Sequence, residues 1–244
     1  MSAPLMQVRD LTMDFAGLRA LSSVDFDVAE GRITGIIGPN GAGKTTLFNL
    51  IAGRFRPTRG HIRFADCEIA GLRPNAICRM GISRTYQTVR PFPGLSVLDN
   101  VRVALLYGRR AGALSHAEIE HEVLETLDFV HLRPLADRLA ERLIPLERKR
   151  LELARALATG PRLILLDELI AGLTPTETLE MMETIRAINE RGITVLLIEH
   201  VMKAVMGLSH HVVVLHHGEK IAEGDPAAVA QHPDVIQAYL GARL

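Results

Sequence analysis

The chain has 244 residues, of which 48% are hydrophobic and 23% charged, so it can bury the core of one large domain. Lysine plus arginine and aspartate plus glutamate number 28 each, and this balance argues against partners recognised by overall charge, such as nucleic acid or an anionic membrane. Two lone cysteines, Cys67 and Cys78, match neither a zinc site nor a disulfide framework and favour a reducing cytosol.

The N-terminus lacks the basic and apolar stretches of a signal peptide, and no apolar run approaches the ~18–20 residues of a membrane span. We therefore expect any membrane role to pass through a partner. Residues 5–30 alternate as strands do, with a turn at Ala16-Gly17, and predict an antiparallel flank beside a core sheet. Phe15, just before the turn, is either an ordinary half-buried strand residue or a ring that stacks on adenine.

A glycine-rich loop comes next. A short apolar run ends at Ile37, and Leu47, Leu50 and Ile51 recur at helical spacing, so we expect a buried strand before the loop and a helix after it. The loop fits G-x-x-x-x-G-K-[ST], the Walker A phosphate loop. The residues expected to bind nucleotide are Gly38, Pro39, Asn40, Gly41, Ala42, Gly43, Lys44, Thr45 and Thr46.

Each fixed position of this motif has a physical task. Glycines let the backbone turn its N–H groups toward phosphate oxygens, and the following helix points its N-terminus at the anion. Lys44 is expected on the β- and γ-phosphates, and the Thr45 hydroxyl on Mg²⁺. The alternative is a glycine-rich turn with an incidental lysine, but the chain has only four lysines, and the strand–helix context favours phosphate binding.

Beyond the first helix, residues 53–60 with Pro57 predict a loop, and residues 62–65 a short strand. Gln87 lies in a polar stretch that by itself indicates only a solvated loop. From residue 91 to residue 150 the pattern becomes helical after a Pro-Phe-Pro-Gly turn, with one clear helix near His116–Val130. This stretch interrupts the α/β alternation and predicts a helical insert.

The α/β alternation then resumes to the C-terminus. A helix is expected over Glu147–Ala158, a buried strand over Leu163–Leu166, a helix over Thr176–Asn189 and a strand over Ile193–Ile198. Two further strands, 212–215 and 220–222, and a C-terminal helix follow. Strands alternating with helices predict a mainly parallel sheet that binds ligands at its carboxyl ends.

The strand 163–166 ends in Asp167-Glu168, which makes it a Walker B element. At that edge Asp167 can reach Mg²⁺ through water, and Glu168 can polarise the attacking water. An apolar strand that ends in two acids often has no function beyond the fold. Here the strand follows a Walker A loop, which favours a role for the two acids in the nucleotide site. The histidines at 210, 211, 216 and 217 also invite a metal interpretation. Because adjacent strand residues face opposite sides, we expect structural or solvated roles for these histidines.

The order of these motifs identifies a family resemblance. The chain offers Walker A, Gln87, a helical insert, the helix 147–158, Walker B, a D-loop at 171–173 and His200 at the end of the next strand. This order resembles the ATP-binding cassette of ABC transporters over essentially the whole chain. The resemblance implies an α/β P-loop NTPase (RecA-like) fold in a single domain 1–244, with a catalytic core of 1–90 and 151–244 and an insert of 91–150.

The resemblance also implies roles, with ATP and Mg²⁺ as cofactors. Gln87 would contact Mg²⁺ and the attacking water and sense a membrane subunit. His200 would touch the γ-phosphate, and Phe15 would stack on adenine. Two cassettes would close head to tail, each holding ATP between its own Walker A loop and its partner's signature loop.

Residues 84–101, 196–226 and 232–241 are similar to the subgroup that serves importers of branched-chain amino acids and related amides. That subgroup implies a second cassette subunit, two polytopic membrane subunits and, indirectly, an extracytoplasmic substrate-binding protein. It places the chain peripherally on the cytoplasmic face of the inner membrane. A nucleic-acid or ribosome ATPase would usually carry tandem cassettes or long coiled insertions, and a GTPase an Asn-Lys-x-Asp motif; the chain has none of these.

One departure from the family pattern concerns the signature loop. The family usually has Leu-Ser-Gly-Gly-Gln, whereas this chain has Leu143-Ile144-Pro145-Leu146-Glu147. The serine hydroxyl and the glycines are gone, and Pro145 has no N–H. A regulatory, weakly hydrolysing half of an asymmetric cassette dimer therefore stays open as the alternative function. We expect one complete active site with a different partner cassette.

Overall fold

The computed structural model describes residues 4–86 and 91–240, and a six-stranded sheet forms its centre. The strand order is β10-β9-β3-β8-β7-β6, and every neighbouring pair is parallel except β10 with β9. The strands are β3 (Ile33–Ile37), β6 (Ile82–Arg84), β7 (Leu163–Asp167), β8 (Thr194–Ile198), β9 (His211–His216) and β10 (Glu219–Gly224). Every residue of β3, β7 and β8 is buried, which explains their unbroken apolar sequences.

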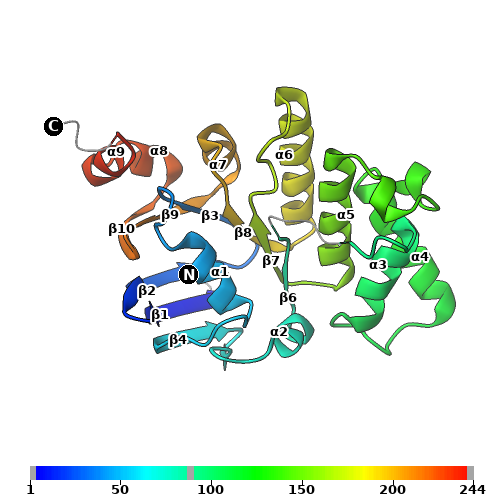
Figure 1. The fold of residues 1–244 in the computed structure, drawn as a ribbon, viewed down its shortest axis with the longest axis horizontal. Coiled ribbons are helices and arrows are strands. Elements are labelled where there is room, and N and C mark those ends of the chain that lie inside the picture. Colours follow the sequence, from blue (N-terminus) through cyan, green and yellow to red (C-terminus); the bar gives the residue numbers. More distant parts are fainter. Residues whose placement is uncertain (1–3, 87–90, 241–244) are drawn as a thin grey trace.

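A second, antiparallel sheet flanks the first, as the alternation of residues 5–30 predicts (Figure 1). Its order is β2-β1-β4-β5, with β1 (Met6–Phe15), β2 (Leu18–Val28), β4 (Arg59–Phe64) and β5 (Cys67–Glu68). The turn between β1 and β2 places Ala16 and Gly17 at positive φ, 44° and 92°. Strand β4 begins at Arg59, so it takes the last two residues of the predicted loop 53–60.

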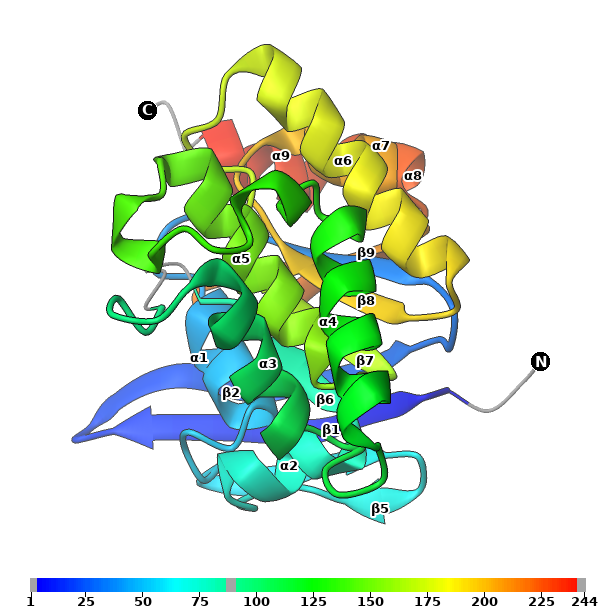
Figure 2. The same cartoon turned by 90° about the vertical axis from the view of Figure 1, so that its right-hand side faces the viewer.

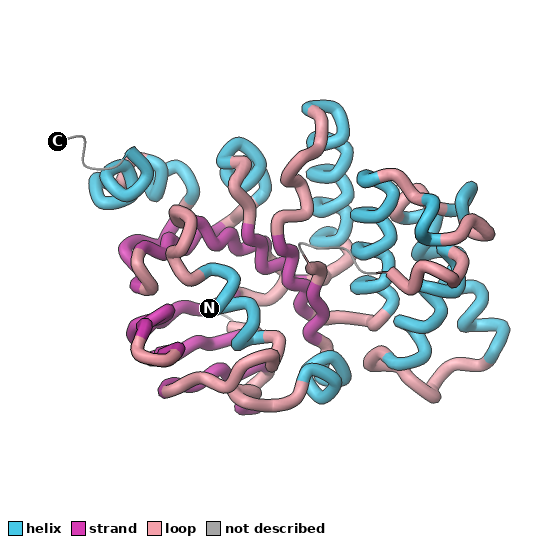
Figure 3. Tube along the Cα trace, viewed as in Figure 1, coloured by secondary structure: helices cyan, strands magenta, loops and turns pink. Residues whose placement is uncertain are grey.

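Helices cover both faces of the central sheet (Figures 1 and 3). The α-helices are α1 (Lys44–Ile51), α2 (Pro74–Met80), α3 (Val97–Tyr107), α4 (His116–Phe129), α5 (Pro145–Ala158), α6 (Pro175–Glu190), α7 (Met202–Leu208), α8 (Pro226–Ala230) and α9 (Pro233–Leu240). Two 3₁₀ turns, Arg133–Leu135 and Ala140–Arg142, join α4 to α5. The predicted C-terminal helix is thus two short helices, and α2 and α7 have no counterpart in the sequence prediction.

The insert is a group of helices beside the sheet, in which α3, α4 and α5 pack together (Figure 2). Its core includes the buried side chains Val101, Val123, Leu127 and Leu151. Helix α4 begins at a capping box: the Glu118 N–H donates to the Ser115 hydroxyl, and the Ser115 N–H donates to the Glu118 carboxylate. The boundary expected at residue 150 falls inside α5, which continues toward the sheet.

The start of α5 differs from the prediction. The helix begins at Pro145, two residues before the predicted Glu147, with Ile144 as its N-cap. Proline fits the first turn of a helix because its missing N–H would have no partner there. The α/β class, the mainly parallel sheet, the antiparallel flank and the helical insert are confirmed. Among the residues that the structure describes, no helix is long and apolar enough to cross a membrane.

Candidate active site

Three parallel strands end at one edge of the central sheet and deliver the predicted motifs to the same place. The register pairs Ile36 of β3 with Ile198 of β8, and Ile198 with Asp167 of β7. The Walker A loop, Asp167-Glu168 and Glu199-His200 therefore follow directly from strand ends at the same level. This arrangement is typical of ligand sites at the carboxyl ends of parallel strands.

Two glycines of the Walker A loop are required by close approach. Gly38 has φ of 151°, and a Cβ added there would lie 2.1 Å from the Leu215 carbonyl oxygen. Gly43 has φ of 101°, and its Cβ would lie 2.7 Å from the Ala20 carbonyl oxygen. Only glycine avoids both the contact and the backbone strain. The loop is thereby packed on β9 and β2, and its last residue starts α1.

Lys44 lies across its own loop. Its ammonium donates to the carbonyl oxygens of Gly38 and Pro39, at 2.6 and 2.9 Å. Burial lowers the pKa of Lys44, while the carboxylates of Glu168 and Asp167 act in the opposite direction. The cation is therefore held beside the loop that would receive phosphates, with two carboxylates near enough to affect it.

A cleft of about 540 Å³ joins most of the predicted nucleotide-binding residues. Its walls come from the β1–β2 turn, the Walker A loop, the end of β7 and the end of β8. The lining residues are Phe15, Leu18, Arg19, Ala20, Asn40, Gly41, Ala42, Gly43, Lys44, Thr45, Thr46, Glu168, His200 and His217. Gly38 and Pro39 do not line the cleft. Their carbonyl oxygens accept hydrogen bonds from Lys44 and so position the lysine that does.

Four lining residues were missed by the sequence analysis, and one of them is Ala20 of β2. Leu18 and Arg19 follow the turn after Phe15, and His217 follows β9. Nothing in the sequence marks Leu18 or Arg19, since both look like ordinary residues of an antiparallel strand. His217 was grouped with three other histidines and given a structural or solvated role. Its position next to Gly218, whose Cβ would approach the Ala20 carbonyl oxygen at 2.8 Å, brings it to the cleft.

Phe15 is placed where an aromatic ring can meet a base. It lines the cleft, and 36% of its surface is exposed. Its ring meets that of Phe55 edge to face, with centroids 5.2 Å apart and planes at 78°. Such a contact fixes the orientation of the ring. Phe15 therefore packs on a neighbouring ring, as a strand residue does, and also faces the cleft. Its stacking on adenine stays a prediction.

Glu168 and His200 meet across the ends of β7 and β8. His200 Nε2 lies 2.5 Å from Glu168 Oε1, and the side chains are 39% and 15% exposed. Glu168 has a φ of 51°, which is strained for a residue with a Cβ. A carboxylate at a cleft wall can accept a proton from water, and an imidazole in contact with it can share that proton.

Asp167 lies behind the cleft in a buried polar cluster. Arg84 Nη2 donates to Asp167 Oδ2 at 2.7 Å, and Arg84 Nη1 donates to Asn49 Oδ1 at 2.7 Å. The Asp167 N–H donates to the Thr85 hydroxyl at 3.1 Å. Thr45 and Asp167 both line a neighbouring cavity of about 550 Å³. Arg84 and Asn49 were missed, because a lone Arg or Asn in a strand or helix carries no sequence signal.

The oxygen donors of this cavity fit a hard divalent cation. Mg²⁺ prefers hydroxyl, carboxylate and water oxygens, and Thr45 and Asp167 supply the first two from facing elements. Arg84 engages only one oxygen of the Asp167 carboxylate. Gln87, the third predicted ligand, lies outside the described residues.

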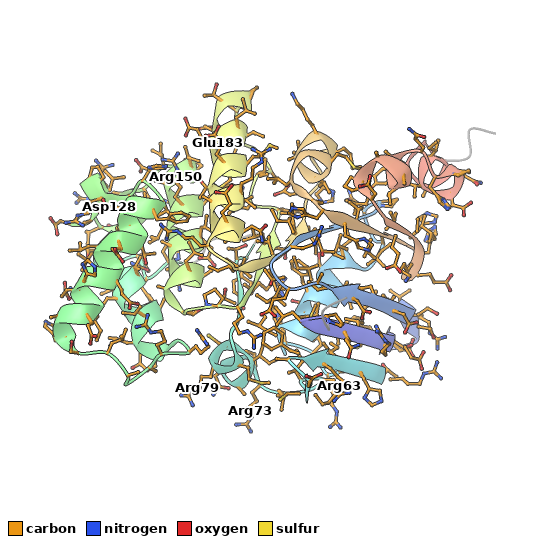
Figure 4. All side chains as sticks on the ribbon, turned by 180° about the vertical axis from the view of Figure 1, so that it is seen from behind. Arg63, Arg73, Arg79, Asp128, Arg150 and Glu183 are labelled. Carbon is orange, nitrogen blue, oxygen red and sulfur yellow. The ribbon has the colours of Figure 1, made fainter. Side chains whose placement is uncertain are left out.

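A second charged surface holds none of the predicted site residues. A hollow of about 590 Å³ between α4, α5 and α6 is lined by Asp128, Arg150 and Glu183 among others (Figure 4). Arg150 there pairs with Glu180 at 2.6 Å, and no predicted site residue takes part. His210 has a structural role, since its Nδ1 accepts from the Ile33 N–H at 3.0 Å. Within residues 4–86 and 91–240, no three histidine, cysteine or acidic side chains form a metal-binding group.

The fold and the site together define a P-loop nucleotide-binding cassette, with a Walker A loop, a Walker B strand end and a histidine on adjacent parallel strands. The ABC transporter family matches residues 21–171, and the branched-chain amino acid ATP-binding cassette transporter family matches residues 219–244. The chain belongs to the ABC transporter family, and it is an ATPase cassette of that family.

Full-length relatives carry related names. The chain is 42% identical to the high-affinity branched-chain amino acid transport ATP-binding protein BraF of Pseudomonas aeruginosa, over 99% of both chains. It is 41% identical to the protein LivG of Escherichia coli K12, named in the same way, again over 99% of both. A probable LivG of Archaeoglobus fulgidus is 34% identical over 98% of this chain and 96% of its own.

Solved structures agree with this assignment. An ATP-binding cassette of an ABC transporter superposes with a TM-score of 0.89 at 30% identity, over 98% of this chain and 100% of that one. The ADP conformation of the same cassette gives 0.85, also at 30% identity and with the same coverage. A cassette solved in its ADP conformation therefore has the same fold as this chain.

One buried acid beside the site gives the stability a pH dependence. Glu199, only 1% exposed, accepts the Ile170 N–H on its Oε1 at 2.6 Å. Burial raises the pKa of Glu199 from 4.5 to about 7, against the opposing effects of the Ile170 N–H and the Lys149 charge. The folded protein thus holds a proton at Glu199 that the unfolded chain releases between these two values.

We predict that this contribution to the free energy of unfolding is fully present below pH 4.5 and is lost as the pH rises through about 7. Urea unfolding at a series of pH values measures it. Relative to Glu199→Gln, which has no such proton, the unmodified chain should lose roughly 3 kcal/mol or less over this range. A pH-independent difference between the two proteins would contradict the assignment.

Proposed function

We propose that this chain is the ATP-hydrolysing subunit of an importer of branched-chain amino acids or related small amides. The observation that carries the proposal is the cleft in which the Walker A loop, Glu168 and His200 face one another. Relatives at 41–42% identity over 99% of the chain, named for branched-chain amino acid transport, support the cargo class. A cassette subunit does not touch the cargo, so the cargo class is supported by those names and by the branched-chain amino acid cassette family that matches residues 219–244.

Different residues of the cleft bind different parts of the nucleotide. Phe15 stacks on the adenine, and the backbone N–H groups of residues 38–46 bind the phosphates at the N-terminus of α1. Lys44 exchanges the carbonyl oxygens of Gly38 and Pro39 for the β- and γ-phosphates. Thr45, Asp167 and Gln87 hold Mg²⁺, which supplies Lewis-acid stabilisation of the phosphate oxygens when bound.

Hydrolysis then depends on Glu168 and His200. Glu168 accepts a proton from the attacking water, and Gln87 helps to orient that water. In the structure His200 lies 2.5 Å from Glu168. With ATP bound, it contacts the γ-phosphate and stabilises the charge that develops there. Arg84 keeps the Asp167 carboxylate in place from the neighbouring strand.

We predict separate effects for two substitutions in the cleft. Lys44→Ala should abolish nucleotide binding, because the lysine charge acts on the phosphates of bound ATP. Glu168→Gln should keep nucleotide affinity and lower turnover by roughly 10²-fold or more, because the carboxylate acts as water is activated. Equilibrium binding and steady-state ATPase assays of the assembled transporter test this. Normal hydrolysis by Glu168→Gln would show that Glu168 is not the general base.

The proposed partners are a second, different cassette subunit, two polytopic membrane subunits and, through these, an extracytoplasmic substrate-binding protein. The chain would lie peripherally on the cytoplasmic face of the inner membrane. Support comes from a groove of about 310 Å³ between α2, β6, α3 and α5, with Pro74, Tyr86 and Arg155 in its wall. Phe92 lies over Arg155, with its ring centroid 5.3 Å from the guanidinium, and is 45% exposed.

Phe92→Ala should uncouple transport from ATP turnover without unfolding the chain. The ring is exposed beside the groove, while the backbone of Phe92 is fixed by bonds to Asn100 at 2.8 and 3.1 Å, which the substitution leaves intact. The measurement is transport per ATP hydrolysed in reconstituted vesicles. Leu179→Ala on α6, equally an exposed apolar residue, serves as the control. Normal coupling in Phe92→Ala would remove this surface from the proposal.

The altered signature supports an asymmetric pair of cassettes. Segment 143–147 leads into α5, and the Glu147 carboxylate accepts the Ile144 N–H at 3.0 Å. A carboxylate thus occupies the helix N-terminus at which a signature would bind the partner's γ-phosphate. Pro145 offers no N–H, and Ile144 and Leu146 offer no polar side chain. This chain's own Walker A site would pair with a complete signature from another cassette, and the opposite site would turn over slowly.

Alone, the chain should show poor ATP-driven dimerisation, even as Glu168→Gln. Losing two or three donors to a charged phosphate removes several kcal/mol of closed-state stabilisation, at roughly 1.5–3 kcal/mol each. Gel filtration with ATP and Mg²⁺ compares that variant with one that also carries Ile144→Ser, Pro145→Gly and Leu146→Gly. The restored protein should dimerise more tightly, and an equally tight homodimer without restoration would contradict the asymmetric model.

A further inference from the structure

The segment 168–171 connects the end of β7 to the D-loop and carries Glu168 at its start. Glu168 has a φ of 51°, a conformation that a residue with a Cβ keeps only when its surroundings hold it. Its N–H donates to the Ile198 carbonyl oxygen at 2.9 Å, and Leu169 and Ile170 are 4% and 1% exposed. The contacts made by this backbone therefore decide where the Glu168 carboxylate lies.

Lys149 holds the segment from α5. Its ammonium donates to the carbonyl oxygens of Glu168, Leu169 and Ala171, at 3.2, 2.7 and 2.8 Å. A lysine has three N–H donors, so all of them are used on this one segment. Burial lowers the pKa of Lys149, and the carboxylates of Glu199 and Glu168 act against that shift. The half-buried Lys149 ammonium, bound at three points, therefore holds this segment in place.

Glu199, which follows β8, holds the same segment through a second contact. Its Oε1 accepts the Ile170 N–H at 2.6 Å. Among the described residues its Oε2 is buried without a hydrogen-bond partner. Burying an ionisable carboxyl group is costly, so this acid is a poor choice for stability alone. Its neighbour His200 makes the 2.5 Å contact with the Glu168 side chain.

We propose that Lys149 and Glu199 are positioning residues that clamp the segment 168–171 between α5 and β8 and keep the Glu168 carboxylate aimed at the attacking water. This inference rests on the proposed role of Glu168 as the general base. Lys149 binds three carbonyl oxygens of the segment, and Glu199 binds one of its amide N–H groups. Neither side chain lines the nucleotide cleft, so neither needs to touch ATP.

The clamp has a consequence for the pair of cassettes. Helix α5 begins at Pro145, inside segment 143–147, and Lys149 lies in its second turn. A helix moves as a rigid body over such a short length, so a displacement of its first turn also displaces the Lys149 ammonium. The start of α5, which would face the partner's nucleotide, is thereby connected through Lys149 to the backbone that carries Glu168 in the same chain.

The first test replaces Lys149 by methionine, which is similar in length and cannot donate. In the assembled transporter, kcat for ATP hydrolysis should fall by about tenfold or more, because a small misplacement of a catalytic group is costly. The affinity of the full chain for a fluorescent ATP analogue should stay within about twofold. Lys203→Met, an exposed lysine on α7, is the matched control and should leave both quantities unchanged.

The second test uses two replacements of similar size at Glu199. Glutamine keeps an acceptor for the Ile170 N–H, whereas leucine does not. We expect Glu199→Gln to keep kcat within about threefold and Glu199→Leu to lose about tenfold or more, both with near-normal nucleotide affinity. Thermal unfolding of each variant checks the fold. If Lys149→Met does not fold, the Glu199 pair decides the question.

The outcomes separate this inference from the proposed function. Normal kcat in both Lys149→Met and Glu199→Leu, beside a stalled Glu168→Gln, would overturn the clamp and leave Glu168 as the general base. Normal kcat in Glu168→Gln would instead remove the proposed function on which the clamp rests. A loss of nucleotide affinity as large as the loss of kcat would also overturn the clamp, because a positioning role affects turnover alone.

Discussion

The parallel register of β3, β8 and β7 is the constraint on which the site depends. Because Ile36 pairs with Ile198 and Ile198 with Asp167, the three strands end at the same level. Alternate side chains of each strand pack in different hydrophobic clusters, so a one-residue slip of the register would exchange the two sets of side chains and disrupt the packing of both. Core packing therefore sets the relative positions of a phosphate loop, two acids and a histidine, and brings Glu168 and His200 into direct contact.

Each of three ionisable groups at this edge of the sheet has a hydrogen-bonding partner. Asp167 is paired with Arg84, Glu168 with His200, and Lys44 with carbonyl groups of its own loop. Buried charges need such partners, since removing an ion from water is costly. The partners of Lys44 are the ones that bound phosphates can replace, so the site is stable before nucleotide arrives and can exchange contacts when it does.

Much of the fold followed from local pattern. The buried strands 163–166 and 193–198, the helix near 116–130 and the hairpin at Ala16-Gly17 all lie within one or two residues of their predicted positions. Helix α2 and helix α7 were missed because each is a single short stretch of seven residues. The start of α5 was placed two residues late, because Pro145 was interpreted as part of a loop motif when it opens the helix.

By itself the sequence determined the chemistry: a phosphate loop, two strand-end acids, a histidine and the family order of these motifs, because each is a contiguous stretch with a fixed spacing. Only the tertiary structure decided which distant side chains support them. Arg84 reaches Asp167 across 83 positions, and Lys149 reaches the Glu168 carbonyl group across 19. Such contacts have no local periodicity, since they arise when the packing of strands and helices brings separate segments together.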